Sequence, residues 1–377
     1  MTSRERVLCS LNHEEPDKMP IDFGGVHTSI HKNIHKQLLD YYGFNVYEAP
    51  IQEIVQQIVY PDERLIEKYQ PDVIGVYPRP TSNAIQDFEP KNGEIVDEWG
   101  NTYIKPEDGY YYDIKTNIMS NFTVEDLDSY KWPDPSDKSR VAGLREEVIK
   151  LRENTDKAII LFSASWGLWE NLWLQRGFEQ AYVDIGININ FVEKFWDKFL
   201  WWNKEFWNNM LEEVGDLVDV IQIGDDLGGQ RGPLFNPEIY REKLKPRHID
   251  LISSIKSKTN AKVYFHSCGD VHWAIEDFIE SGIDILNPVQ LNAEGMDSKS
   301  IKKEFGDRIC FWGGGCNTDV LLKGSKKDVE LEVAKRIEDL APGGGYVFAS
   351  IHNIQSNCPP ENVAAMYETA VKLRDYH

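Results

Sequence analysis

The chain has 377 residues, of which 41% are hydrophobic, and its 62 acidic residues outnumber its 41 basic residues, giving a formal net charge of −21 at pH 7. This composition is typical of a globular protein with a large core and excludes an intrinsically disordered one. The excess negative charge repels nucleic acid and anionic lipid, so we expect neither as a partner. Residues 1–20 contain no apolar signal-peptide core, and no apolar run approaches the length of a membrane span, so we expect a cytoplasmic protein.

Eight short apolar segments predict strands, and amphipathic stretches between them predict helices. The strand segments are 19–23, 72–77, 158–163, 218–223, 262–266, 284–287, 309–312 and 346–350. Alternation of strand and helix implies parallel strands, and eight repeats predict an α/β fold, a (β/α)₈ TIM barrel, with residues 1–377 as one domain. No G-x-G-x-x-G sequence follows a strand, so a dinucleotide fingerprint is absent.

Residues 82–135 interrupt the strand and helix alternation after the second strand. Within them, the alternating sequence EIVDEWGNTYIKP predicts a β-hairpin that turns near Gly100 and Asn101. We interpret 82–135 as an insertion on the barrel, either plain decoration or a lid or partner surface.

Helices are predicted at 141–152, 237–257, 272–281 and 326–340, and a long one at 190–214. The last carries an aromatic stripe from Phe195 to Val214 at steps of three and four. Such a stripe is typical of an outer helix that faces the core, with a subunit interface as the alternative.

Polar residues follow the predicted strands, where barrel enzymes place their active sites. In strand order they are Glu170, then Asp225, Asp226 and Gln230, then His266 and Cys268, then Asn287 with Gln290, then Cys316, and last His352.

His266 and Cys268 form an H-x-C pair, which a strand would present on one face with the spacing to share an ion. Imidazole and thiolate together suit Zn²⁺, and a catalytic zinc needs three protein ligands and one open position. The further ligand could be His352, Cys316, Cys358 or Asp226. The alternative is a hydrogen-bonded histidine beside a buried thiol. Five cysteines without a secretion signal do not suggest a disulfide framework.

Histidines 27, 31 and 35 follow helical spacing, and Lys32 and Lys36 directly follow the last two of them, so we predict a solvated helix face here. We predict the same for His248, which neighbours Lys245 and Arg247.

Several long motifs in this order resemble the uroporphyrinogen decarboxylase superfamily, among them RERVLCSLNHEEPDKMPIDFGG, FHSCGDV, FWGGGCNT and GGGYVFASIHNIQSNCPPENVAAMYE. The resemblance implies a (β/α)₈ barrel of a kind that is often dimeric, so we expect a homodimer. Decarboxylases of this superfamily carry an arginine-containing motif after the first strand, whereas this chain has IDFGGVHTSIHKN there. We therefore favour the other branch, the corrinoid-dependent methyltransferases, over a decarboxylase-type lyase.

That branch implies zinc-dependent methyl transfer between a small methyl donor or acceptor and the corrinoid of a separate protein. In its thiol-methylating members, zinc is held by H-x-C and a later cysteine, and His352 stands here at the place of that cysteine. The resemblance implies zinc ligands among His266, Cys268, His352 and Cys316. Asp226, Glu170 and His352 are the expected catalytic residues, and Gln230 and Asn287 the expected cofactor contacts. We favour demethylation of a donor such as an aryl methyl ether over thiol methylation, and keep a barrel that only binds a ligand as a further alternative.

Overall fold

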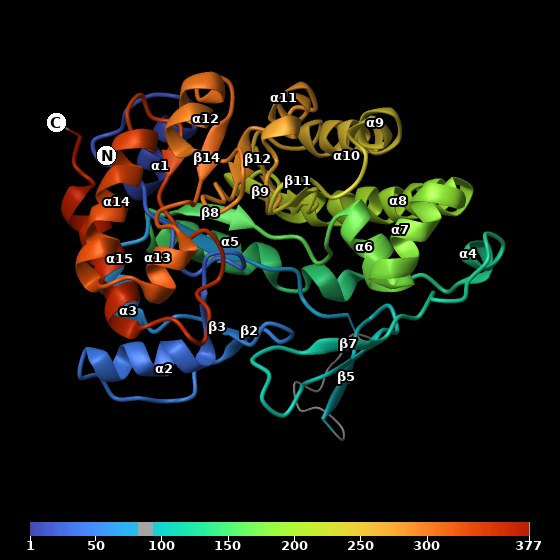
Figure 1. Ribbon diagram of the computed structural model, residues 1–377, viewed down its shortest axis with the longest axis horizontal. Helices are drawn as coiled ribbons and strands as arrows, with labels where there is room; N and C mark the ends of the chain where they lie inside the picture. The colour runs from blue at the N-terminus through green and yellow to red at the C-terminus, as the bar shows by residue number, and fades with distance from the viewer. Residues whose placement is uncertain (82–92, 377) are drawn as a thin grey trace.

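The computed structural model describes residues 1–81 and 93–376, and its centre is a seven-stranded parallel sheet (Figure 1). The spatial order β15-β14-β13-β12-β9-β8-β4 follows the chain order, as in a barrel. The strands are β4 (Val73–Val76), β8 (Ala158–Leu161), β9 (Val220–Gly224), β12 (Lys262–His266), β13 (Ile285–Asn287), β14 (Cys310–Trp312) and β15 (Tyr346–Val347). All seven lie within segments predicted as strands, apart from the last residue of β9.

Residues 20–22 close the sheet between β15 and β4. The Asp22 N–H donates to the Phe348 carbonyl at 2.8 Å, and the Phe348 N–H donates to the Pro20 carbonyl at 2.9 Å. On the other side the Asp72 N–H donates to the Ile21 carbonyl at 2.7 Å. The predicted first strand, 19–23, therefore occupies its place in the barrel but is only an isolated bridge, in part because Pro20 has no N–H to donate.

Helices surround the sheet, and most lie where the sequence predicts them. The predicted helix at 237–257 contains a π-helical turn at Tyr240–Leu244, a wide turn of the helix. It forms because the ring of Pro246 would clash with the preceding turn of a regular α-helix. In the described parts of the chain, no helix combines the length and apolar content that crossing a bilayer requires. The α-helices are α1 (Ser3–Leu11), α2 (Lys32–Tyr41), α3 (Glu63–Tyr69), α4 (Asp126–Ser129), α5 (Leu144–Asn154), α6 (Leu168–Arg176), α7 (Phe178–Ile187), α8 (Ile189–Val214), α9 (Pro237–Ile239), α10 (Lys245–Lys256), α11 (Ile275–Glu280), α12 (Ser298–Phe305), α13 (Thr318–Lys323), α14 (Lys326–Leu340) and α15 (Pro360–Leu373).

The aromatic stripe of α8 is buried within this chain. Trp202 and Phe199 are fully buried, and their rings lie 5.0 and 5.2 Å from the ring of Trp99, which lies in the loop of the hairpin. The stripe therefore belongs to the core and anchors the segment that contains Trp99.

The predicted hairpin is confirmed as β5 (Glu94–Val96) and β6 (Thr102–Ile104), paired antiparallel with Glu94 opposite Ile104 and extended by β7 (Asp113–Thr116). This small sheet projects from the barrel on the side away from α12 (Figure 1). Residues 82–92 of the predicted insertion lie outside the described residues. A second small sheet, β1 (Ile30–His31), β3 (Ile58–Val59) and β2 (Ile51–Glu53), adjoins α2.

Candidate metal centre

His266 ends β12, and its ring is oriented by Asn287, which ends the neighbouring β13. The Asn287 Nδ2 donates to the Trp312 carbonyl at 2.9 Å, so its Oδ1 faces His266. His266 Nδ1 then donates to this Oδ1 at 2.6 Å. This bond places the ring proton on Nδ1 and leaves Nε2 as an acceptor, which is the tautomer that a metal ligand needs.

Cys268 and Asp226 both approach this nitrogen, and the Cys268 thiol lies within hydrogen-bond distance of it. Cys268 Sγ lies 3.4 Å from His266 Nε2, and Asp226 Oδ1 lies 3.9 Å from it. Asp226 Oδ1 also accepts the Cys268 N–H at 2.7 Å. The three donor atoms all lie within 4.8 Å of one another, so the structure brings together the predicted H-x-C pair and one of its proposed partners.

The loops that carry Asp226 and Cys268 touch through glycine backbones. A Cβ on Gly269 would lie 2.1 Å from the Gly228 carbonyl oxygen, and the φ angle of Gly269 is +86°. The Asp270 N–H donates to the Gly229 carbonyl at 2.7 Å. Only glycine permits this approach, which fixes the two loops against each other.

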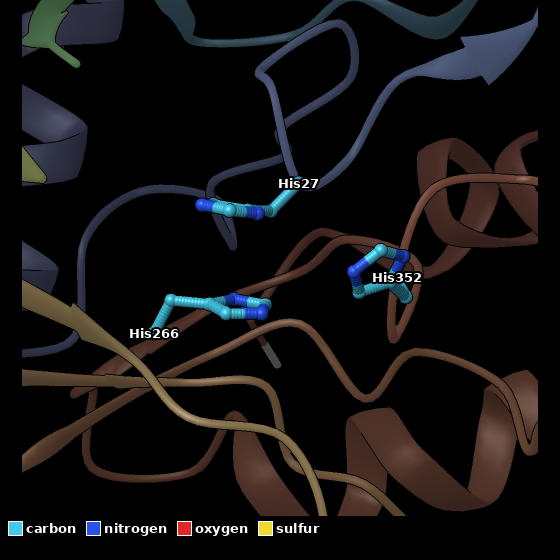
Figure 2. Close-up of side chains that lie close together, drawn as sticks. All are labelled: His27, His266 and His352. Atoms are coloured by element: carbon cyan, nitrogen blue, oxygen red, sulfur yellow. The ribbon is translucent and has the colours of Figure 1, made fainter. Parts of the chain in front are cut away.

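His27 and His352 form a second group of donors with His266, again within 4.8 Å. The His27 ring stacks on the His266 ring at 3.8 Å and 13°, and His352 lies beside both (Figure 2). The predicted solvated face is wrong for His27, His31 and His35, which are all at most 4% exposed. Because α2 begins only at Lys32, His27 belongs to a loop, where no helical spacing applies.

Burial dominates the electrostatics of the group. It lowers the pKa of His266 and of His352 to about 4, and it lowers the pKa of His27 well below its ordinary value. It also raises the pKa of the Cys268 thiol, with the charges of Asp226 and Glu170 adding to the rise. The imidazoles are therefore neutral. A bound divalent cation would favour the thiolate and the carboxylate.

Glu170 and Asp225 lie behind Asp226. Asp225 caps α6 by accepting the N–H groups of Trp169 at 2.9 Å and Glu170 at 3.0 Å. His248 Nε2 contacts the same carboxylate at 3.1 Å, so the predicted solvated position of His248 is wrong; its side chain is buried behind the site. Burial, then the charges of Asp226 and Asp225, raises the pKa of the Glu170 carboxyl well above its ordinary value.

The structure does not bring the remaining predicted residues into the group. Cys316 and Cys358 are buried in the core between sheet and helices, and their thiols donate to the carbonyls of Asn317 and Leu321. Gln230 is exposed on the turn between β10 (Gly228–Gly229) and β11 (Gly232–Pro233). Asn287 is buried and orients His266.

A cavity of about 480 Å³ opens from the group toward the hairpin. His27, His266 and Glu170 line it near the candidate metal centre. The lining arginines Arg79 and Arg140 are both paired, Arg79 with Glu147 and Arg140 with Glu98 at 2.6 Å. The other lining residues include the apolar and aromatic side chains Val26, Ile51, Ile54, Val55, Tyr60, Tyr77, Trp99, Tyr103, Trp166 and Leu174.

Comparisons with known proteins agree with this architecture. The profile of the family described as uroporphyrinogen decarboxylase (URO-D) matches residues 111–373. Uroporphyrinogen decarboxylase from Legionella pneumophila (strain Corby) is 25% identical over 171 residues, which span 45% of this chain and 45% of that protein. A solved methyltransferase from Methanosarcina mazei superposes with a TM-score of 0.67 at 19% identity, covering 99% of each chain, and this likeness shows the shared fold.

Proposed function

Since the chain belongs to the uroporphyrinogen decarboxylase family, we propose that it is a zinc-dependent methyltransferase of the corrinoid-dependent branch. The observation that carries this proposal is the meeting of Asp226, His266 and Cys268 donor atoms beside a cavity. The enzyme would move a methyl group between a small donor, such as an aryl methyl ether, and the corrinoid of a separate protein. We further propose that it acts in the cytoplasm as a homodimer.

The donor set fits zinc. Imidazole, thiolate and carboxylate are its usual ligands, and three protein ligands leave a position for substrate. Asn287 supplies the outer hydrogen bond that metal-binding histidines require. Zinc, when bound, supplies a Lewis acid for an ether oxygen or a thiolate. The donor atom of His352 lies in one group with those of His266 and His27, so His352 is the alternative third ligand.

The protein's own residues would bind and orient the substrate and manage a proton. Glu170 lines the cavity, and because burial raises its pKa, its carboxyl would carry a proton that it could donate to an oxygen of a bound substrate. The aromatic side chains that line the cavity would pack against an aromatic ring of the substrate. The volume of the cavity suits a small ligand. Because both lining arginines are already paired, the described part of the chain (1–81 and 93–376) offers a multiply carboxylated tetrapyrrole no evident anchor, which favours methyl transfer over the lyase reaction.

Metal analysis of protein purified without chelators tests the proposal. We expect one zinc per chain in the wild type and a loss of zinc in the His266→Ala Cys268→Ala variant. We also expect the wild type, but not this variant, to transfer methyl from 2-methoxyphenol to cob(I)alamin, followed by the absorbance change of the corrinoid. A wild-type protein that is folded but contains no zinc, or a double variant that retains it, would contradict the proposal.

A further inference from the structure

His27 is a histidine that no motif marks and that the proposed zinc ligands do not include. It lies in the loop between residues 20–22, which close the barrel, and β1. This loop is tied at both ends: Thr28 Oγ1 donates to Asp22 at 2.7 Å, and the Ser29 N–H donates to Asn353 Oδ1 at 3.0 Å. Asn353 directly follows His352, so this hydrogen bond holds the loop that carries His27 beside His352.

The ring of His27 lacks the hydrogen bonds that explain other buried histidines. Its Nδ1 is buried without a partner. His35 and His248 also bury a free Nδ1, but His35 Nε2 accepts the Asp62 N–H and His248 Nε2 contacts Asp225. In residues 1–81 and 93–376, the His27 ring is held by stacking on His266 rather than by such a bond. A buried polar nitrogen without a hydrogen-bond partner is costly unless something binds it.

The partner best placed for that nitrogen is the ion bound by His266. The donor atoms of His27, His266 and His352 lie within 4.8 Å of one another, and Figure 2 shows the three rings around a common point. The two stacked rings are nearly parallel, so His27 must turn about χ2 to share an ion with His266, and this torsion is soft in histidine.

We propose that His27 is a ligand of the metal ion on the side that faces the cavity. Of the donors around the ion, His27 and His266 line the cavity, and His266 is held in place by Asn287. His27 is therefore the ligand that a substrate would meet and displace. This inference rests on the proposed function, because it requires that an ion is bound.

Metal binding by the full-length protein tests the proposal directly. Apo protein would be titrated with Zn²⁺ against a chromophoric chelator, and with Co²⁺ while its visible absorption is recorded. His27→Phe keeps a ring for stacking, and His27→Ala opens the position. Since loss of even an outer partner of a ligand costs about 10–100-fold in affinity, we expect both variants to bind zinc at least about tenfold more weakly.

We also expect the Co²⁺ spectrum to change in both variants and added imidazole to restore it in His27→Ala but not in His27→Phe. Cys316→Ser is the matched control and should bind both ions as the wild type does. Circular dichroism would establish that each variant is folded. If folded His27 variants bind zinc and cobalt with wild-type affinity and spectrum, His27 is not a ligand. A wild type that binds no ion would contradict the proposed function and this inference together.

Discussion

Replacing Asn287 with alanine should weaken both the fold and the metal site, by amounts that follow from its two hydrogen bonds. Its side chain is fully buried and bonds His266 Nδ1 at 2.6 Å and the Trp312 carbonyl at 2.9 Å. The substitution leaves two buried polar groups without partners, which at about 1–3 kcal/mol each lowers the free energy of unfolding by about 2–6 kcal/mol. Without its acceptor, His266 can adopt the wrong tautomer, so zinc affinity should fall by about 10–100-fold.

Urea unfolding of the apo protein and zinc competition with a chromophoric chelator separate these two effects. Asn287→Asp is the control, because its carboxylate still accepts from His266 but cannot donate to Trp312. We expect this control to lose stability while keeping most of its zinc affinity. Wild-type zinc affinity in folded Asn287→Ala would refute the reasoning that the tautomer of His266 sets metal binding.

Three further predictions concern charge and ligand identity. Burial raises the pKa of Asp22 from 3.8 to about 6, so its stabilising contribution is full below pH 3.8 and is lost as pH rises through about 6. The loss is about 3 kcal/mol at about 1.4 kcal/mol per pH unit. Asp22→Asn should therefore gain that much relative to the wild type between pH 4 and pH 7.5 in urea unfolding, and a constant difference would contradict this origin. Cys316→Ser should retain one zinc per chain by metal analysis, because this thiol lies in the core. Loss of zinc in this variant would indicate that Cys316 is a zinc ligand. Zinc affinity should rise between pH 6 and pH 8, by about tenfold per pH unit for each proton released, because burial raises the pKa of Cys268. Chelator competition at several pH values measures this rise, and a flat profile would mean that no thiol proton is displaced.

The barrel could be predicted because its strands are continuous apolar runs buried on both faces, and helical periodicity separates most of them. The local backbone geometry of two segments could not be predicted. Residues 19–23 have the apolar pattern of a strand, but Pro20 and the brief pairing of Ile21 leave them an isolated bridge. The wide turn at Tyr240–Leu244 depends on Pro246 within an otherwise regular helical pattern. Neither feature changes the hydrophobic periodicity on which the prediction was based.

The order of the strands made part of the candidate site predictable. His266, Cys268 and Asp226 follow neighbouring strands of the barrel, so strand order alone brings them together. Cys316 also follows a strand, but its side chain packs into the core between sheet and helices, a distinction that strand order does not make. His27 was misplaced because the spacing of residues 27, 31 and 35 imitates a helix, although α2 starts after His31. Its position soon after the first strand segment was the sequence clue that it lies near the candidate metal centre.

The contact between Gly228 and Gly269 has a consequence for how this centre could diversify. Because the two loops meet backbone to backbone, any side chain at either glycine would move Asp226 and Cys268 together rather than one at a time. Substitution of the ligands themselves can change which chemical group is offered to an ion. The positions of those groups are set by the main chain, so substitutions in a descendant of this protein could change the types of side chain in the candidate metal centre more easily than its place.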